Sequence, residues 1–265
     1  MSINCLTKFE VLKRVSKSYL GTLLNILTFF DHITANGTSC VLDFKLRPFE
    51  TFQKDLVIYG TYSKNGFLRS EEISLIKELS RQNYLVVVQN GSVIDPLLPQ
   101  LNCSYILRNN MGRDFGMLRD ALTILDISSR KMNLVWLNSS SNWNANYLQK
   151  MIKDEESHGT AAVVSMTDSW RGGYHLQSFF YLVHSNYLNT FVNFFTSRNV
   201  RNWRYKRTVV FRGEKKLSKY LEKSGLKLGS FYPTKVFSPN QYKYVTTYLD
   251  FKNQLFRAGA PFSKV

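Results

Sequence analysis

Short apolar runs and helical repeats alternate along the middle of the chain. Four apolar runs that end at polar or glycine residues predict strands, at 56–59, 84–88, 105–107 and 134–137. Helices are predicted at 71–81, with Ser70 as N-cap, and at 117–125, where apolar residues recur at helical spacing. Strands that alternate with helices form right-handed βαβ units. The pattern therefore predicts an α/β fold with a central, mostly parallel sheet flanked by helices.

A polar cluster follows each predicted strand. In chain order the clusters read GTYSKNG, QNGS, RNNMGRD and NSSSNW. The carboxyl ends of parallel strands share one edge of a sheet, and ligands bind there. This arrangement resembles the nucleotide-binding half of a GT-A glycosyltransferase, in which a sugar nucleotide lies across the strand ends. Periodicity alone does not separate it from a Rossmann enzyme.

The first 30 residues carry an amphipathic helical pattern. Apolar residues recur near the helical period from Leu6 to Phe30, and basic residues lie between them, at Lys8, Lys13, Arg14 and Lys17. Two interpretations stay open: an interfacial helix on an anionic membrane, or a core-facing helix of a basic protein. The apolar run at 19–30 is shorter than the roughly 20 residues that span a bilayer. The N-terminus also lacks the pattern of a secretory signal.

Charge narrows the class of partner. The 265 residues include 35 Lys and Arg against 19 Asp and Glu, a net charge of +16. Such an excess indicates an anionic partner: nucleic acid, lipid headgroups or a phosphorylated small molecule. The three cysteines are widely spaced and form no Cys-x-x-Cys pair, which argues against a disulfide framework or a zinc site and favours a reducing cytoplasm.

Residues 114–116 spell Asp-Phe-Gly, a triplet that holds magnesium in protein kinases. The sequence has no glycine-rich G-x-G-x-x-G loop, no V-A-I-K lysine and no His-Arg-Asp catalytic loop. A kinase is therefore excluded, and the triplet needs another explanation.

Five blocks resemble the rhamnan synthesis protein F family of bacterial polysaccharide glycosyltransferases. They are LVIYGTYSKNG, ILRNNMGRDFGMLRDAL with LVWLNSSSNW, HLQSFFYLVHSNYL, GEKKLSKYLEKSGLKLGSFYP and the closing LFRAGAPFSKV. They run in the family's order from about residue 56 to the end, and Asp-Phe-Gly becomes part of an Asn-x-Gly-x-Asp-Phe-Gly loop that opens a helix. The resemblance implies a GT-A-like domain at 51–265, preceded by a helical amphipathic extension at 1–50.

The resemblance also implies a nucleotide-sugar site. Its expected residues follow the predicted strands or open the next helix: Tyr62, Asn90, Ser92, Arg108, Asn110, Gly112, Arg113, Asp114, Gly116, Asn138, Ser139 and Gln177. Gly112 and Gly116 would let the backbone turn and approach a ligand, and the arginines would offset diphosphate charge. Asp114 either contacts a sugar hydroxyl or caps the helix. Arg119, inside that helix, is expected to face solvent.

A metal site is doubtful on the sequence. GT-A enzymes usually carry Asp-x-Asp where this chain reads Asn138-Ser139-Ser140, and the family's typical Leu-Asn-Asp-Ser has its Asp at Ser139. Hydroxyls are weaker ligands than carboxylates for Mg²⁺ or Mn²⁺. Three interpretations remain: basic side chains offset the diphosphate charge without metal, the chain has lost activity, or this is a plain polar turn.

Two residues are candidates for acid–base chemistry. An inverting transferase needs a base for the acceptor hydroxyl, and Glu214 is the candidate, at the start of a helix predicted over 214–223. A first-turn Glu also complements the helix dipole, so a purely structural role stays open. His175 either hydrogen-bonds a sugar or acts as base, with a structural role as the alternative.

We therefore expect a glycosyltransferase that moves a sugar, rhamnose from a dTDP-linked donor by resemblance, onto a lipid-linked bacterial surface polysaccharide. Its expected location is cytoplasmic, peripheral at the inner face of the membrane, beside other polysaccharide-assembly enzymes. Two alternatives stay open. One is an inactive glycosyltransferase-like scaffold. The other is a nucleic-acid-binding protein, in which the interleaved basic and aromatic residues of 198–207 would bind a single strand. Nucleic acid is not the expected partner.

Overall fold

The computed structural model describes residues 8–49, 55–81, 83–170, 173–197, 200–234 and 262–264. The main sheet runs in the order β1-β4-β3-β2-β5-β9-β7-β10, with β8 paired to β7. These strands are β1 (Val41–Lys45), β2 (Asp55–Tyr62), β3 (Tyr84–Asn90), β4 (Ser104–Arg108), β5 (Asn133–Asn138), β7 (Val163–Ser169), β8 (His175–Leu176), β9 (Phe180–Val183) and β10 (Leu228–Tyr232).

The pairing of the central strands confirms the predicted fold class. Strands β4, β3, β2 and β5 are mutually parallel, and β10 is parallel to β7. Antiparallel pairs join β1 to β4 and insert β9 between β5 and β7. A separate two-stranded sheet pairs β6 (Ser141–Trp143) with β11 (Phe262–Lys264). The protein is therefore an α/β fold with a central, mostly parallel sheet.

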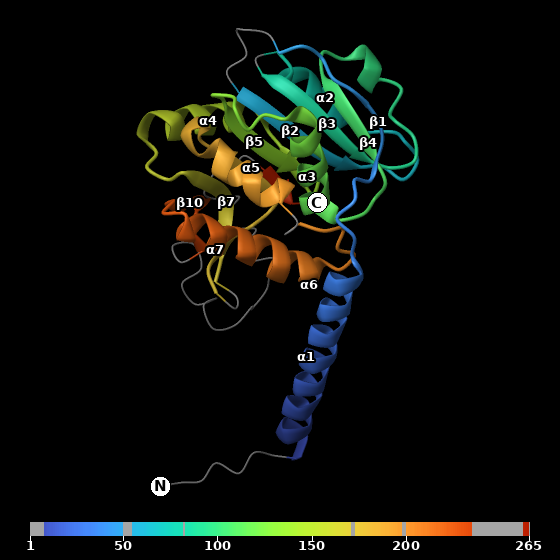
Figure 1. Cartoon of the computed structure of the whole chain (residues 1–265), viewed down its shortest axis with the longest axis vertical. Coiled ribbons are helices and arrows are strands. Elements are labelled where there is room, and N and C mark those ends of the chain that lie inside the picture. The colour runs from blue at the N-terminus through green and yellow to red at the C-terminus, as the bar shows by residue number, and fades with distance from the viewer. Residues whose placement is uncertain are drawn as a thin grey trace.

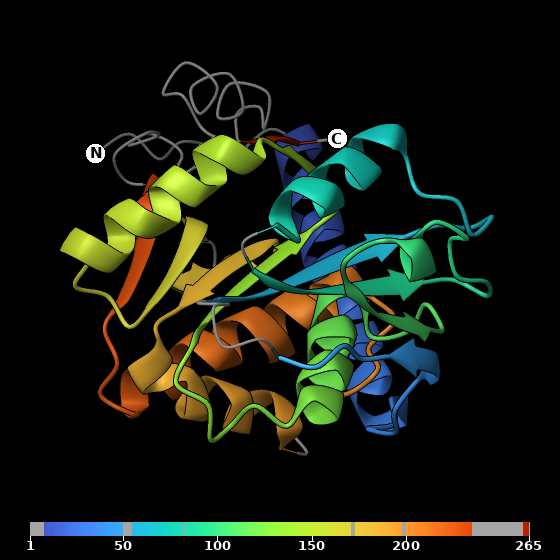
Figure 2. The same ribbon diagram turned by 90° about the horizontal axis from the view of Figure 1, so that it is seen from above.

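Helices cover both faces of the sheet (Figure 2). One face packs against α3 (Arg113–Leu125), α5 (Leu188–Thr196) and α7 (Lys215–Lys223), and the other against α2 (Ser70–Leu79) and α4 (Ala145–His158). Short helical turns are η1 (Leu98–Gln100), η2 (Ser185–Tyr187) and α6 (Lys206–Thr208), and a π-helical segment, η3 (Val209–Glu214), leads into α7.

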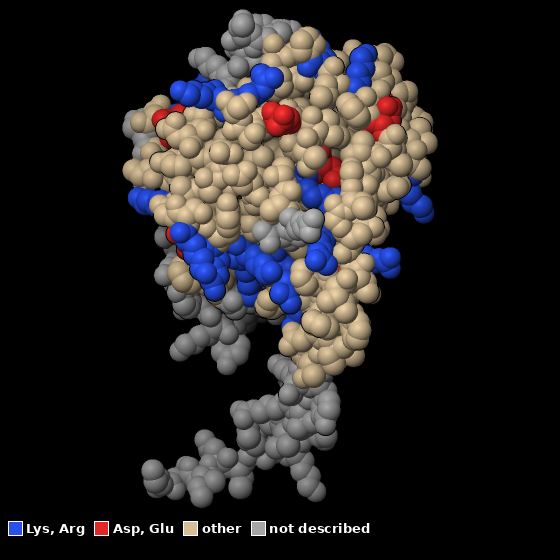
Figure 3. Space-filling model, viewed as in Figure 1, with Lys and Arg blue, Asp and Glu red and all other residues tan. Residues whose placement is uncertain are grey.

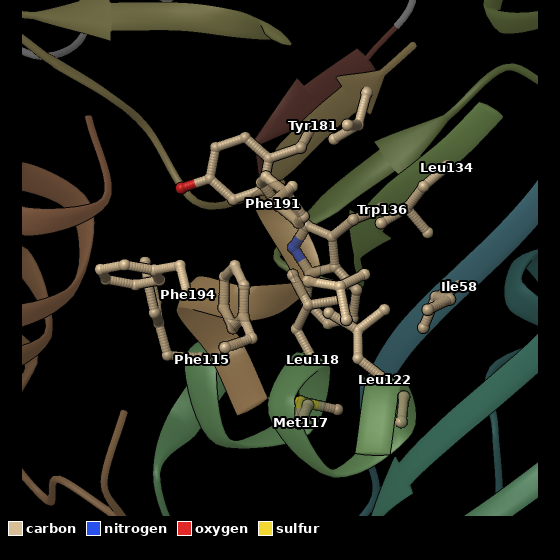
Figure 4. Close-up of a cluster of buried hydrophobic side chains, with 14 of the residues drawn as sticks. Ile58, Phe115, Met117, Leu118, Leu122, Leu134, Trp136, Tyr181, Phe191 and Phe194 are labelled. Atoms are coloured by element: carbon tan, nitrogen blue, oxygen red, sulfur yellow. The ribbon is translucent and has the colours of Figure 1, made fainter. Parts of the chain in front are cut away.

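Trp136 of β5 is at the centre of the first core layer, among Ile58, Leu118 and Phe191 (Figure 4). Its indole Nε1 donates a hydrogen bond to the Ser178 carbonyl at 2.7 Å, which satisfies the indole's polar group inside the core. This contact ties β5 to the segment that carries the predicted His175–Gln177 block. The core therefore positions the candidate site directly.

The helix α1 (Lys8–Thr34) projects from the body (Figure 1). Its polar residues Thr28 and Asp31 are buried against the body, whereas its apolar residues face solvent. Of the two interpretations drawn from its sequence, a core-facing apolar face is wrong for the described residues 21–34. The strand β1 lies before residue 51 and joins the main sheet, and the division at residue 50 stays a prediction.

Two local predictions are wrong. Arg69, not Ser70, is the N-cap of α2, because the Arg69 N–H donates to the Glu72 carboxylate in a capping box. Arg119 does not face solvent: it is 5% exposed, and its guanidinium pairs with Asp120 at 2.7 Å and donates to the Thr38 carbonyl. The residues before β1 cover this face of α3, which its own sequence pattern could not reveal.

Candidate active site at the carboxyl ends of the parallel strands

A cavity of about 420 Å³ lies at the carboxyl ends of β2, β3 and β5. We call it the strand-end cavity. Its lining includes seven residues that were predicted to bind a nucleotide sugar, namely Tyr62, Asn90, Asn110, Arg113, Asp114, Asn138 and Ser139. The structure thus brings together residues from four separate polar clusters. This agrees with the expectation that clusters following parallel strands meet at one edge.

One wall of this cavity is built on Glu72 of α2. The Glu72 carboxylate accepts hydrogen bonds from the Tyr59 hydroxyl at 2.8 Å and the Thr61 hydroxyl at 2.6 Å, and it pairs with Arg69 Nε at 3.0 Å. These hydrogen bonds hold the pKa of Glu72 below its usual value although burial opposes them. Glu72 is therefore a charged anchor that fixes Arg69 at the cavity, beside the half-exposed ring of Tyr62.

Arg108 has a structural role in this arrangement. It is fully buried, pairs with Asp120 at 2.9 Å and donates through Nη1 to the Asn90 amide oxygen at 2.7 Å. The Asn90 amide nitrogen in turn donates to Asn110 at 3.2 Å. Arg108 does not line the strand-end cavity, and it orients two residues that do.

The loop before α3 depends on its glycines. Gly112 has φ of +76°, and a Cβ there would come within 2.8 Å of the Asn202 amide oxygen. A Cβ on Gly116 would lie 2.7 Å from the Met111 carbonyl. Neither glycine lines the strand-end cavity, and their small size serves packing within the chain. Arg113, also at positive φ, lines the strand-end cavity and donates to the Arg204 carbonyl at 3.0 Å.

The Asn138–Ser140 turn is closed by hydrogen bonds within the chain. The Asn138 side-chain oxygen accepts hydrogen bonds from the Ser140 N–H at 3.1 Å and hydroxyl at 2.6 Å, while the Ser139 N–H donates to the Gly60 carbonyl at 2.8 Å. No group of three or more His, Cys, Asp or Glu suited to a metal ion occurs among the described residues. The Asn138 side-chain oxygen is thus engaged by Ser140 of the same turn. A divalent cation at this turn stays a prediction.

A second cavity, of about 660 Å³, adjoins the first. We call it the helix-lined cavity, because η3 and its neighbours supply Lys206, Arg207, Val209, Val210, Phe211, Glu214 and Lys215. Both cavities are lined by Arg113, Asp114, Asn138 and Ser140, so they meet at these residues. Arg207 and Lys215 lie over the Phe211 ring, at 5.3 and 3.9 Å from its centroid. This cavity therefore combines positive charge with an apolar floor.

Two acids meet where the cavities join. The Ser178 N–H donates to Glu214 Oε1 at 2.9 Å, and the Ser178 hydroxyl donates to Asp114 Oδ2 at 3.2 Å. Burial and the negative charge of Glu214 raise the pKa of Asp114 to about 6. Ser178 thus joins two carboxyl groups that are 100 positions apart in the chain, and one of them titrates near neutral pH.

His175 and Gln177 also lie in the helix-lined cavity. The His175 ring is 3% exposed, with Nδ1 2.9 Å from the Gly173 carbonyl and Nε2 3.7 Å from Glu214 Oε2. A carbonyl only accepts, so Nδ1 carries a hydrogen and donates it to Gly173. The other ring nitrogen, Nε2, faces the Glu214 carboxylate. The Gln177 side-chain oxygen accepts from the Thr167 hydroxyl. Both predicted residues line this cavity, and His175 lies beside Glu214.

Four predicted site residues, Ser92, Arg108, Gly112 and Gly116, line neither cavity. Ser92 is exposed, whereas the other three are buried. The prediction also missed Arg69 and Glu72, although an acidic first turn directly after a strand-end loop is a usable signal. It missed the lining role of Lys206 and Arg207, because the 198–207 segment was considered only for nucleic acid, and it also missed that of Lys215. Trp203 of that segment is fully buried, so it offers no ring for base stacking.

The sequence matches no protein-family model and no curated protein sequence. Among solved structures, the chain is similar to a mannosyltransferase from Pyrobaculum calidifontis in complex with GDP-Man and Mn²⁺, with 13% identity, TM-score 0.43, and coverage of 82% of this chain and 64% of that chain. It is also similar to a 4-diphosphocytidyl-2C-methyl-D-erythritol synthase, with 11% identity, TM-score 0.42, and coverage of 77% and 100%.

A third similar structure is the glycosyltransferase GlyE of Streptococcus pneumoniae, with 13% identity, TM-score 0.37, and coverage of 78% of this chain and 51% of that chain. Likeness at this level does not decide an activity, and the specific resemblance to rhamnan synthesis protein F is not confirmed. The function therefore has to be inferred from the residues of the two cavities.

Proposed function

We propose that the protein is a glycosyltransferase that uses a nucleotide-diphosphate sugar as donor. The donor's nucleotide would occupy the strand-end cavity, and the acceptor would occupy the helix-lined cavity. The observation that carries the proposal is the acid pair Asp114 and Glu214, bridged by Ser178 where the two cavities join. A reaction between two bound molecules needs both of them to reach one acid–base group.

The strand-end cavity suits a nucleoside diphosphate. The ring of Tyr62 is 53% exposed and offers a face on which a base can stack. Arg69 is held by Glu72, and Arg113 opens α3, so two guanidinium groups line the cavity where diphosphate charge would lie. The positive end of the α3 dipole adds to this field.

Transfer follows from the position of the acids. The acceptor hydroxyl oxygen attacks the anomeric carbon and forms the new glycosidic bond, while the bond from that carbon to the diphosphate oxygen breaks and its electron pair leaves with the diphosphate. Asp114 takes the hydroxyl proton, because it lines both cavities and its pKa of about 6 leaves it ionised at neutral pH. Glu214, the base expected from the sequence, then acts by raising the pKa of Asp114. His175 pairs with Glu214 when protonated.

The family resemblance supports the finer assignment. It supports dTDP-rhamnose as donor and a lipid-linked surface polysaccharide as acceptor, with other polysaccharide-assembly enzymes as partners. A lipid-linked acceptor also fits the apolar floor of the helix-lined cavity at Phe211. The inactive-scaffold alternative makes the opposite prediction, namely no binding of a nucleotide sugar at the strand-end cavity.

The test is a binding panel on the full chain, read by thermal shift and calorimetry. We expect dTDP-rhamnose to raise the melting temperature more than UDP-glucose, GDP-mannose or inorganic diphosphate. The panel is repeated with Mn²⁺ and with chelator, since a divalent cation stays a prediction of the resemblance. A shift that persists in Arg69→Ala and Arg113→Ala would place binding elsewhere, and no shift with any nucleotide sugar would contradict the proposal.

A further inference from the structure

Large apolar side chains make up much of the solvent-exposed surface of α1. Within residues 21–34, six large apolar side chains are 40–54% exposed: Leu23, Ile26, Leu27, Phe29, Phe30 and Ile33. The side of this helix that contacts the body is polar instead, with Thr28 and Asp31 buried. A helix that buries its polar side and exposes its apolar side has no apolar partner among the described residues, and a patch of this kind marks an interaction surface.

The helix is joined firmly to the body at its C-terminal end. The Asp31 carboxylate accepts hydrogen bonds from the N–H groups of Arg204 and Tyr205 at 3.0 and 3.2 Å. Arg201 donates to the His32 carbonyl at 3.2 Å, and Arg207, which lines the helix-lined cavity, donates to the Asn25 side chain at 2.9 Å. The apolar surface of α1 therefore has a defined position relative to that cavity.

Positive charge gathers beside the base of α1. In Figure 3, Lys and Arg side chains gather in the region of α6 and α7, next to the C-terminal end of α1 where this helix meets the body. Burial and the nearby charges of Arg212, Arg201 and Lys216 lower the pKa of His32, which shows that these cations lie close to α1. We call the exposed or half-exposed members of this group the basic ridge: Arg201, Arg204, Lys206, Arg207, Arg212, Lys215, Lys216 and Lys219.

We propose that the apolar surface of α1 and the basic ridge together dock the protein on the surface of an anionic lipid bilayer. Apolar side chains next to several cations match the acyl boundary and the negative headgroups of such a surface. A second copy of the chain is a worse partner, because pairing would bring two basic ridges and two net charges of +16 together. Among the described residues, none of the helices has the length and hydropathy of a membrane span.

Docking in this way brings the helix-lined cavity to the lipid surface, since Arg207 belongs to both the ridge and the cavity lining. The benefit of this placement rests on the proposed function, because it matters only if the acceptor is carried by lipid. The docking itself does not require sugar transfer. Vesicle binding can therefore fail while transfer to a soluble acceptor persists, and the reverse can also occur, so the two proposals are separable.

The test is co-sedimentation of the full chain with vesicles of phosphatidylcholine alone or mixed with phosphatidylglycerol. Phe29→Ser with Phe30→Ser should lower partition onto the mixed vesicles by about tenfold or more, because two exposed rings lose their burial in lipid. Phe67→Ser with Val93→Ser is the matched control, since those side chains are 69% and 60% exposed in other loops and line neither cavity.

Charge is tested separately. Lys216→Glu with Lys219→Glu should lower binding to the mixed vesicles by about tenfold or more, and more strongly at low salt than at high salt. Lys77→Glu with Lys153→Glu makes the same charge change on α2 and α4, on the other face of the sheet, and should leave binding within about twofold.

The proposal predicts strong binding to the mixed vesicles and weak binding to phosphatidylcholine alone. Equal binding of the wild-type protein to both vesicle types would overturn it. Unchanged binding by the Phe29→Ser, Phe30→Ser variant and by the Lys216→Glu, Lys219→Glu variant would also overturn it. Light scattering gives a third measurement. A dimer that the Phe29 and Phe30 substitutions dissociate, in a protein that does not bind vesicles, would assign the surface to a second copy and would also overturn the proposal.

Discussion

The two cavities differ in how their walls are held. In the strand-end cavity, the Glu72 carboxylate accepts hydrogen bonds from the Tyr59 and Thr61 hydroxyls and pairs with Arg69. The Ser139 N–H donates a hydrogen bond to the Gly60 carbonyl. One wall of the helix-lined cavity is formed by side chains of α6, η3 and the first residue of α7, with long cations over Phe211. One wall is a network of buried hydrogen bonds, and the other is a set of long side chains on one helical segment.

This difference indicates different ligands. A fixed polar wall suits a ligand whose shape is constant, as the nucleotide of a donor is. Long cations over an apolar floor adapt to ligands that differ in shape, as a growing glycan does. Glu214 is the last residue of the π-helical segment, lines the second wall and accepts a hydrogen bond from the Ser178 N–H; π-helical turns are frequent at functional sites. The following substitutions test whether the two cavities have separate roles.

The largest effect is expected at Asp114, where the cavities meet. Asp114→Asn keeps the shape of the side chain but removes the proton acceptor, so kcat should fall by roughly 10²-fold or more. Donor Kd, measured by calorimetry on the same preparation, should stay nearly unchanged. Asp126→Asn is the matched control, because Asp126 ends α3 in an exposed, left-handed conformation that Asn also accepts. Equal kcat in both variants would remove Asp114 from the mechanism.

The same substitution should stabilise the protein in a pH-dependent way. A folded-state pKa of about 6, raised from 3.8 chiefly by burial, means that the folded state binds this proton more tightly than the unfolded state. Wild-type stability from this group is therefore lost as pH rises between these values. Urea unfolding near pH 8 should show Asp114→Asn more stable by about 3 kcal/mol, with little difference below pH 4. An equal gain at both pH values would contradict the assignment.

A smaller effect is expected in the strand-end cavity alone. Tyr62→Ala removes the exposed ring, and loss of stacking on a base should raise donor Kd by about tenfold. The KM for acceptor should not change, because Tyr62 does not line the helix-lined cavity. Tyr147→Ala removes a ring of 43% exposure on α4 and serves as control. A rise in acceptor KM would show that the cavities are not separate in function.

The smallest effect is expected at Phe211. Phe211→Ala removes the ring under Arg207 and Lys215, and cation–π contacts at exposed sites contribute about 0.5–1 kcal/mol. Acceptor KM should rise about threefold, and donor Kd should stay the same. Steady-state kinetics at saturating donor measures this directly. A weaker donor Kd with unchanged acceptor KM would reverse the proposed assignment of the cavities.

The sequence predicted the central sheet well because its strands are short apolar runs with polar ends. The predicted strands at 56–59, 84–88, 105–107 and 134–137 all lie inside β2, β3, β4 and β5. The same logic brought Tyr62, Asn90, Asn138 and the loop before α3 to one edge. Ser92 is the exception, since the chain turns away into an exposed loop after β3.

The acid pair could not be predicted, because Asp114 and Glu214 meet only through the packing of α3 and η3 and a contact with Ser178. The π-helical segment was also not predicted. Glu214, which was expected to open a helix over 214–223, is the last residue of η3, and α7 begins at Lys215. Arg119 was assigned to solvent for a related reason: the partner that buries it, the segment near Thr38, lies about 80 positions away. Amphipathic patterns alone likewise do not say which side of α1 faces the body.

The pH dependence of sugar transfer in wild type and Glu214→Gln is the most direct test of the central claim. The account predicts a wild-type kcat that rises with pH through a midpoint near 6, because Asp114 must be ionised to take the proton. In Glu214→Gln the midpoint should move to lower pH, since the charge that raises the pKa of Asp114 is gone. The same midpoint in both proteins, or a rate that does not depend on pH across this range, would contradict the account.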